Sequence, residues 1–160
     1  MGIVVEREAF AKFRDTFEPS ATIVFTNGCF DLLHPGHFRL LRYARSLGDL
    51  LVVGINSDAS ARRLKGPDRP IVPQHVRAAA LCALESVDVV IVFDELDPVP
   101  TIHAVRPAIH VKGGDYGAED MPEAQVVESY GGKVVIMPLV AGLHSTAYVE
   151  SARRFAKGPD

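Results

Sequence analysis

Apolar residues recur along this chain at two different spacings. Short unbroken apolar runs rich in β-branched residues are typical of buried strands, and five of them occur, at 22–26, 50–55, 87–93, 109–111 and 133–137. Apolar residues spaced three or four apart are typical of helices packed on one side. This spacing predicts helices at 6–17, 38–47, 58–64, 74–84, 99–105 and 122–130, and a last one from about residue 145.

Each predicted strand is apolar on both of its faces, and a helix follows it. Strands buried on both faces belong to parallel sheets covered by helices on each side. The pattern therefore predicts an α/β, Rossmann-like fold, a doubly wound five-stranded parallel sheet with helices on both faces. We expect a single domain over residues 1–160, with ligands bound beyond the carboxyl ends of the strands.

Composition narrows the possible functions. The chain has 160 residues, of which 48% are apolar and 23% charged, and its formal net charge is -3. This charge gives no reason to expect nucleic acid or an anionic membrane as a partner. Cys29 and Cys82 are too few for a disulfide framework. Because the sequence shows neither a signal peptide nor an apolar run near ~20 residues, we expect a cytoplasmic protein.

The first predicted strand ends in the richest cluster of polar residues. It runs through Asn27 and Gly28 to His34 and His37, with Pro35 and Gly36 between the histidines. Free amides at the start of a helix favour phosphate, and two imidazoles there could donate hydrogen bonds to phosphoryl oxygens in a transition state. Two surface histidines capping a turn are the alternative.

The other strand ends carry further candidates. Lys65 closes a basic helix just before a Gly-Pro loop, so its ammonium could cover a polyphosphate, although a solvated helix face would look the same. Gly113 and Gly114 would allow close approach to a base, or make an ordinary turn. Ser145 and Thr146 are good helix caps and could form a second phosphate site.

Several well-known sites are absent from the sequence. It contains no P-loop, no G-x-G-x-x-G dinucleotide fingerprint, no H-E-x-x-H and no G-x-S-x-G. His75, His103 and His110 lack the spacing of metal ligands, and we interpret them as structural residues.

The 28–37 stretch resembles the H-x-G-H signature of the cytidylyltransferase-like nucleotidyltransferase superfamily. Residues 26–37, Asn-Ser-Asp-Ala-Ser at 56–60, Arg-Leu-Lys-Gly-Pro at 63–67 and Val-Lys-Gly-Gly-Asp-Tyr at 111–116 look like the adenylyltransferase domain of bacterial ADP-heptose synthesis enzymes. The similarity extends over about residues 3–154. Many relatives fuse this domain to a sugar kinase, whereas 160 residues leave no room for one.

The resemblance implies three sets of site residues. Catalysis would depend on His34, His37 and Lys65. The nucleotide would contact Thr26, Asn27, Gly28, Cys29, Phe30, His34, His37, Lys112, Gly113, Asp115, Gly142, His144, Ser145 and Thr146. The second substrate would contact Asp31, Asn56, Asp58, Lys65 and Arg77.

Two departures bear on the choice of nucleotide. This chain has His144 where relatives have the first serine of Ser-Thr-Thr, and Leu139 where cytidylyl relatives carry the arginine of Arg-Thr-Glu-Gly. Losing that arginine favours ATP over CTP. The resemblance thus implies adenylyl transfer from ATP to D-glycero-D-manno-heptose 1-phosphate, giving ADP-heptose and pyrophosphate, with Mg²⁺. It also implies a homodimer, working downstream of a separate sugar kinase and phosphatase.

Three other readings of the sequence stay open at this point. The first is a cytidylyltransferase acting on a polyol or sugar phosphate, and the second is a nucleotide-binding module without turnover. A flavodoxin-like electron carrier shares the architecture but would not need the paired histidines.

Overall fold

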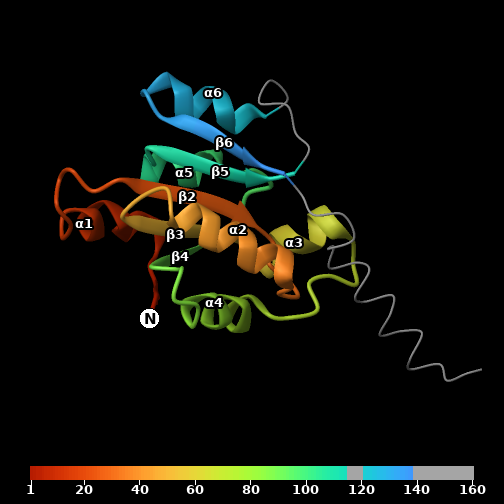
Figure 1. Cartoon of the computed structure of the whole chain (residues 1–160). Helices are drawn as coiled ribbons and strands as arrows, with labels where there is room; N and C mark the ends of the chain where they lie inside the picture. Colours follow the sequence, from red (N-terminus) through yellow and green to blue (C-terminus); the bar gives the residue numbers. More distant parts are fainter. Residues whose placement is uncertain (115–120, 139–160) are drawn as a thin grey trace, which may run out of the picture.

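The computed structural model describes residues 1–114 and 121–138 (Figure 1). Its strands are β1 (Ile3–Val4), β2 (Ile23–Gly28), β3 (Leu50–Asn56), β4 (Val89–Phe93), β5 (Ile109–Gly113) and β6 (Lys133–Met137). Its helices are the 3₁₀ turn Arg7–Ala9, α1 (Phe10–Arg14), α2 (Pro35–Arg45), α3 (Asp58–Lys65), α4 (Gln74–Cys82), α5 (Val99–Val105) and α6 (Pro122–Ser129). None of the helices in these two ranges is long and apolar enough to cross a membrane.

The strands form one parallel sheet in the order β1-β4-β3-β2-β5-β6. From β2 the chain moves outward through β3 to β4, and then returns to place β5 on the other side of β2. Strand order therefore reverses between β2 and β5. In such sheets the crevice beyond the carboxyl ends of the two strands is where ligands bind.

Helices cover both faces of the sheet, because successive residues of a strand point to opposite sides. Val24, Leu51 and Val53 pack with α2 and α4 on one face. Their neighbours Phe25 and Val52 pack with α1, α5 and α6 on the other face. Burying each such side chain contributes about 1.5–3 kcal/mol, so two apolar layers stabilise the sheet. The predicted doubly wound α/β class is confirmed.

Within the described residues the sheet has six strands rather than the five predicted. The added strand, β1, pairs only Ile3 and Val4 with Val89 and Val90 of β4. Two residues are too short to show any periodicity, which is why the sequence did not reveal it. The predicted helix at 6–17 is also shorter, since it divides into the 3₁₀ turn and α1. The predicted last helix lies outside the described residues.

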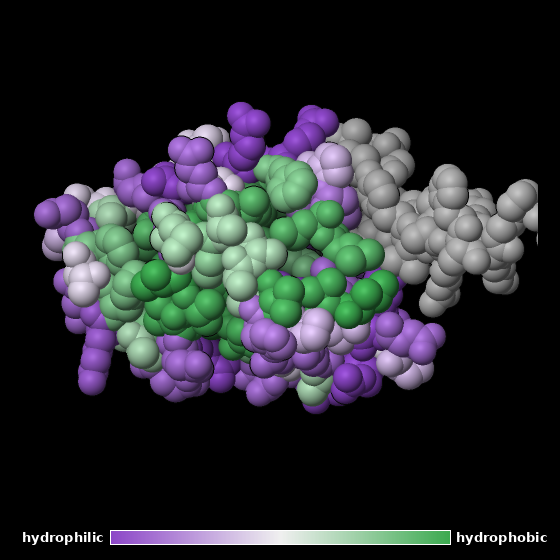
Figure 2. Space-filling model, turned by 90° about the horizontal axis from the view of Figure 1, so that it is seen from below, coloured by the Kyte–Doolittle hydropathy of each residue, from purple (hydrophilic) through white to green (hydrophobic). Residues whose placement is uncertain are grey.

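The outer face of α4 is apolar. Val76 is 44% exposed and Ile71, just before the helix, 49%. Ala79, Ala80 and Ala83 are also exposed, and the spacing 76, 79, 80, 83 places these side chains on one side of the helix. Figure 2 shows a broad hydrophobic band across this side of the molecule.

Candidate functional site

The start of α2 lies directly beyond the end of β2, on the crevice side. His34 is the N-cap in an extended conformation, and Pro35 is the first helical residue. Proline suits this position because the first amides of a helix have no partner inside it. The backbone N–H of His37 donates to the His34 carbonyl, which tightens the first turn. A helix start of this kind favours negatively charged groups.

The structure brings the two predicted catalytic histidines together. Their rings stack with centroids 3.7 Å apart and an interplanar angle of 30°. His34 is 9% exposed, and the His37 ring also lies 5.0 Å from the ring of Phe30. Burial and the neighbouring His34 lower the pKa of His37 to about 4. Without a bound anion, His37 is therefore an uncharged imidazole at neutral pH, and a hydrogen bond with the Leu32 backbone works to raise its pKa.

Phe30 shapes the turn between β2 and α2. Its φ angle is 45°, in the left-handed region that residues other than glycine rarely adopt. Such a conformation persists only where the surroundings hold it, and it occurs often at functional sites. A Cβ added to Gly28 would lie 3.2 Å from the Phe30 ring, so a larger residue there would require this ring to shift.

Asp31 anchors the loop that follows Lys65. Its carboxylate accepts hydrogen bonds from the backbone N–H groups of Ile71 and Val72, at 2.8 and 2.9 Å, and pairs with Arg69 at 2.8 Å. Burial works to raise the pKa of Asp31, but these donors hold it below its ordinary value. The carboxylate predicted to bind substrate is thus already engaged inside the protein.

Lys65 is the last residue of α3 and its side chain is exposed. Burial raises the pKa of the Cys29 thiol, and the charge of Lys65 works to lower it. Lys65 therefore lies near Cys29, at the end of β2. Among the residues that the structure describes, no carboxylate pairs with it. Gly66 then turns the chain with a φ angle of 102°. Lys65 is therefore a cation available to a bound anion.

Arg77 lies beneath the site rather than in it. The guanidinium is buried, donates to the carbonyls of Cys29 and Val72, and pairs with Asp58 at 2.8 Å. Direct contact with substrate was predicted for Arg77, but its side chain is 0% exposed. This residue instead holds three segments in place.

The side chain of Asn56 is likewise hydrogen-bonded to other residues of the protein. Its amide donates to the Ser60 hydroxyl and to the Glu95 carbonyl, and its oxygen accepts from the thiol of Cys29 at 3.6 Å. It therefore joins the end of β3 to α3 and to the loop after β4.

A second polar cluster lies on the other side of β2. The Asn27 side-chain oxygen accepts from His110 Nε2 at 3.2 Å and from Lys112 Nζ at 3.4 Å. Lys112 also donates to Glu123 of α6. Gly113 ends β5 next to this cluster. Thr26, also predicted to bind nucleotide, is fully buried in β2.

The remaining predicted site residues lie outside the described residues. They are Asp115, Gly142, His144, Ser145 and Thr146.

Sequence reasoning missed Arg69 and Glu123, which hold Asp31 and Lys112. No local signal could have identified Arg69, because the fold alone brings it to a partner 38 positions away.

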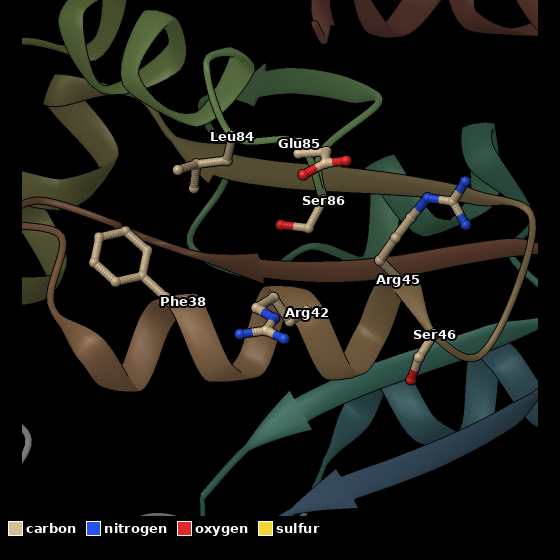
Figure 3. A pocket seen from close by; sticks show the side chains of 7 residues that line it. All are labelled: Phe38, Arg42, Arg45, Ser46, Leu84, Glu85 and Ser86. Carbon is tan, nitrogen blue, oxygen red and sulfur yellow. The ribbon is translucent and has the colours of Figure 1, made fainter.

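A groove of about 610 Å³ lies away from the strand ends, between α2 and the turn before β4 (Figure 3). Phe38 and Arg42 line it from α2, and Leu84 and Glu85 from the turn. Arg45, also on its wall, is engaged by Asp88 at 3.0 Å and by the Gly48 carbonyl. The groove does not touch the paired histidines, so we do not assign it to the chemistry.

Buried neutral histidines predict that stability depends on pH. The pKa values of His37 and His110 are lowered to about 4, chiefly by burial, against about 6.5 in the unfolded chain. Their neutral forms are fully compatible with the fold above pH ~6.5, and stability is lost as pH falls from there toward 4. Melting temperature measured over this range should fall less in His110→Phe than in wild type. The exposed His103→Phe should match wild type, and three identical slopes would contradict this explanation.

Comparison with known proteins shows the family of this chain. The cytidylyltransferase-like family matches residues 25–148. The bifunctional protein HldE of Syntrophotalea carbinolica is 56% identical over 129 residues, and that of Geobacter sulfurreducens 55% over 128. These matches cover 81% and 80% of this chain, but the chain spans about a quarter of the length of these relatives (26% of each).

Two solved structures have the same fold. A lipopolysaccharide core biosynthesis protein from Thermoplasma volcanium is 31% identical with a TM-score of 0.62, over 76% of this chain and 98% of that one. Pantoate-beta-alanine ligase from Francisella tularensis has a TM-score of 0.63 at 15% identity, over 98% of this chain and 78% of that one. The latter likeness shows a shared fold alone.

Proposed function

Since this chain belongs to the cytidylyltransferase-like family and is a nucleotidyltransferase, we propose that it transfers AMP from ATP to D-glycero-D-manno-heptose 1-phosphate. The products would be ADP-heptose, for bacterial surface polysaccharide, and pyrophosphate. The observation that carries the proposal is the stacked pair of His34 and His37 at the start of α2, beside the crevice between β2 and β5.

The choice of substrates is supported by sequence similarity. The segments at 56–67 and 111–116 resemble ADP-heptose synthesis enzymes, and two bifunctional HldE proteins share more than half of the aligned residues. A relative named for lipopolysaccharide core biosynthesis fits the same product class.

The reaction needs positioning and charge stabilisation rather than a base. An oxygen of the sugar phosphate attacks the α-phosphorus of ATP, and the bond from that phosphorus to the bridging oxygen of the β-phosphate breaks. The attacking phosphate is already ionised at neutral pH, so no proton has to be removed. His34 and His37 donate to the α-phosphoryl oxygens as charge develops, while Lys65 holds the phosphates of both substrates.

Mg²⁺ would accompany ATP, where it neutralises the charge on the leaving pyrophosphate. Asp31 and Asp58 are each paired with an arginine. Over 1–114 and 121–138, no group of three His, Cys, Asp or Glu side chains could hold a metal ion. We propose the phosphate oxygens as the ligands of this ion.

Residues 1–160 would act as one nucleotidyltransferase domain in the cytoplasm. A sugar kinase and a phosphatase, both with active sites outside these residues, would supply the heptose 1-phosphate.

The apolar outer face of α4 supports association of two copies as a homodimer (Figure 2). Small side chains at 79, 80 and 83 would allow two such helices to approach closely. Light scattering should give twice the chain mass of 17.3 kDa, and a monomer at that mass would contradict this part.

The acceptor is tested by measuring pyrophosphate release with ATP and a panel of phosphates. Heptose 1-phosphate should give the highest kcat/KM, and glycerol and choline phosphates little release. Equal rates with a polyol phosphate would contradict the heptose assignment. No release with any acceptor, despite nucleotide binding, would indicate a binding module without turnover.

ATP should be preferred over CTP. Leu139, outside the described residues, replaces an arginine of cytidylyl relatives and cannot supply its hydrogen-bond donors to cytosine. A site that satisfies one base leaves polar groups unpaired with the wrong one. We expect kcat/KM for ATP to exceed that for CTP by at least about tenfold, or ~1.4 kcal/mol of transition-state binding. Equal values, or a preference for CTP, would overturn the adenylyl assignment alone.

A further inference from the structure

We propose that His110, Lys112 and Glu123 form a positioning unit that fixes the Asn27 amide so that its NH₂ group donates to the bound nucleotide. The inference rests on the proposed function, because it takes the nucleotide to lie between β2 and β5. Sequence reasoning left His110 and Glu123 out of the site and assigned Lys112 to direct contact with the nucleotide.

The four side chains meet on one face of the sheet. His110 lies opposite Phe25 in the pairing of β5 with β2, and the two rings are 5.4 Å apart. Asn27 and Lys112 follow two residues later on their strands and therefore point to the same side. That side is covered by α6, which contributes Glu123.

Chemistry fixes which way the Asn27 amide faces. The ammonium of Lys112 can only donate, so the Asn27 atom 3.4 Å from it must be the oxygen. His110 Nε2 lies 3.2 Å from the same oxygen. His110 is fully buried, and this burial lowers its pKa to about 4, so the ring is neutral and carries its hydrogen on Nε2. In the opposite orientation the NH₂ group of Asn27 would face the ammonium of Lys112, and both groups are donors.

With its oxygen occupied twice, Asn27 has only its NH₂ group left to offer. This nitrogen has no hydrogen-bond partner within the described part of the chain, and the residue is half-buried at the end of β2. The position is the point where strand order reverses. Oxygen acceptors of a nucleotide, on phosphate or ribose, are the matching chemistry.

Lys112 is not a free cation in the way that Lys65 is. Glu123 is 5% exposed and pairs with Lys112, whose side chain is 20% exposed. Burial works to raise the pKa of Glu123, but the hydrogen bond from Lys112 holds it below its ordinary value. The charge of Lys112 is therefore balanced inside the protein, and the residue acts through Asn27.

Glu123→Gln separates the positioning role from direct contact. ATP affinity is measured by calorimetry on the full chain, and kcat at saturating ATP. The glutamine no longer holds Lys112 by charge, so this variant should bind ATP about tenfold more weakly and change kcat less than about threefold. Glu123→Asp keeps the carboxylate and should recover part of the lost affinity. Glu128→Gln, exposed on the same helix, is the matched control and should equal wild type. If Lys112 touches phosphate directly, releasing it from Glu123 would leave ATP binding unchanged or tighter, which would overturn the proposal.

A second variant keeps the test valid if Glu123→Gln fails to fold. Lys112→Met with Glu123→Leu replaces the pair by apolar side chains, a change that proteins often tolerate. A folded double variant that binds ATP as wild type does would also overturn the positioning role. A wild-type chain that binds none of the four nucleoside triphosphates would contradict the proposed function as well.

Discussion

Replacing His37 with alanine should lower kcat by about 10²- to 10³-fold, the effect of losing one donor to a transition-state oxygen. His37 is stacked on His34 at the start of α2, where a hydrogen bond from its ring can reach that oxygen. ATP affinity should fall much less, because the charge on that oxygen develops only during transfer. His34→Ala should behave alike. Steady-state kinetics and calorimetry measure the two quantities.

Two controls make this result specific. His103→Ala removes an exposed histidine from α5 and should leave kcat unchanged. Melting temperatures identify a variant that fails because it unfolds. A folded His37→Ala protein with near wild-type kcat would remove this residue from the mechanism.

Replacing Lys65 with alanine should lower kcat/KM by about 10²-fold. The side chain is exposed at the end of α3, near the end of β2, and none of the described carboxylates neutralises it. Its loss should reduce both sugar-phosphate binding and the rate, since it would contact phosphates of both substrates.

Arg62→Ala is the matched control, because Arg62 is an exposed cation one turn earlier on the same helix. It should retain wild-type kinetics. Lys65→Arg keeps the charge and should recover part of the loss. If Lys65→Gln matches wild type at all substrate concentrations, the residue belongs to a solvated helix face.

The hydrogen bonds between Asp31 and the loop after Lys65 limit where that loop can move. A Gly-Pro sequence suggests a freely moving loop, but three hydrogen bonds hold its far half at Arg69, Ile71 and Val72. Movement of Lys65 on binding would therefore start at Gly66. This residue has a positive φ angle, and no atom lies within 4 Å of the position that a Cβ would take.

The fold was predictable from the sequence where patterns are local. Unbroken apolar runs identified five strands and their parallel arrangement, since each run packs against apolar residues on both faces. β1 was not predicted, because two exposed residues are too few to show a periodic pattern. The predicted helix at 99–105 matches α5 in both of its ends, whereas the first helix was overextended.

The candidate site was predictable to the extent that its residues follow strand ends. His34 and His37 are placed there by local sequence alone, whereas Lys65, the last residue of α3, is brought near the end of β2 by the fold. The burial of Arg77 and the roles of Asp31 and Glu123 depend on partners brought by other elements, which no spacing reveals. The polar residues near the strand ends are thus of two kinds. Some face the crevice, and others bond the segments around it to one another.

Labelled ATP tests the central claim most directly. The full chain is incubated with heptose 1-phosphate, Mg²⁺ and ATP carrying ³²P at either the α or the γ position. Transfer of AMP predicts that the α label enters a sugar nucleotide and that the γ label leaves in pyrophosphate. His37→Ala should slow both in parallel. A γ label found in the sugar product, or an α label that stays in ADP or ATP, would contradict nucleotidyl transfer by this site.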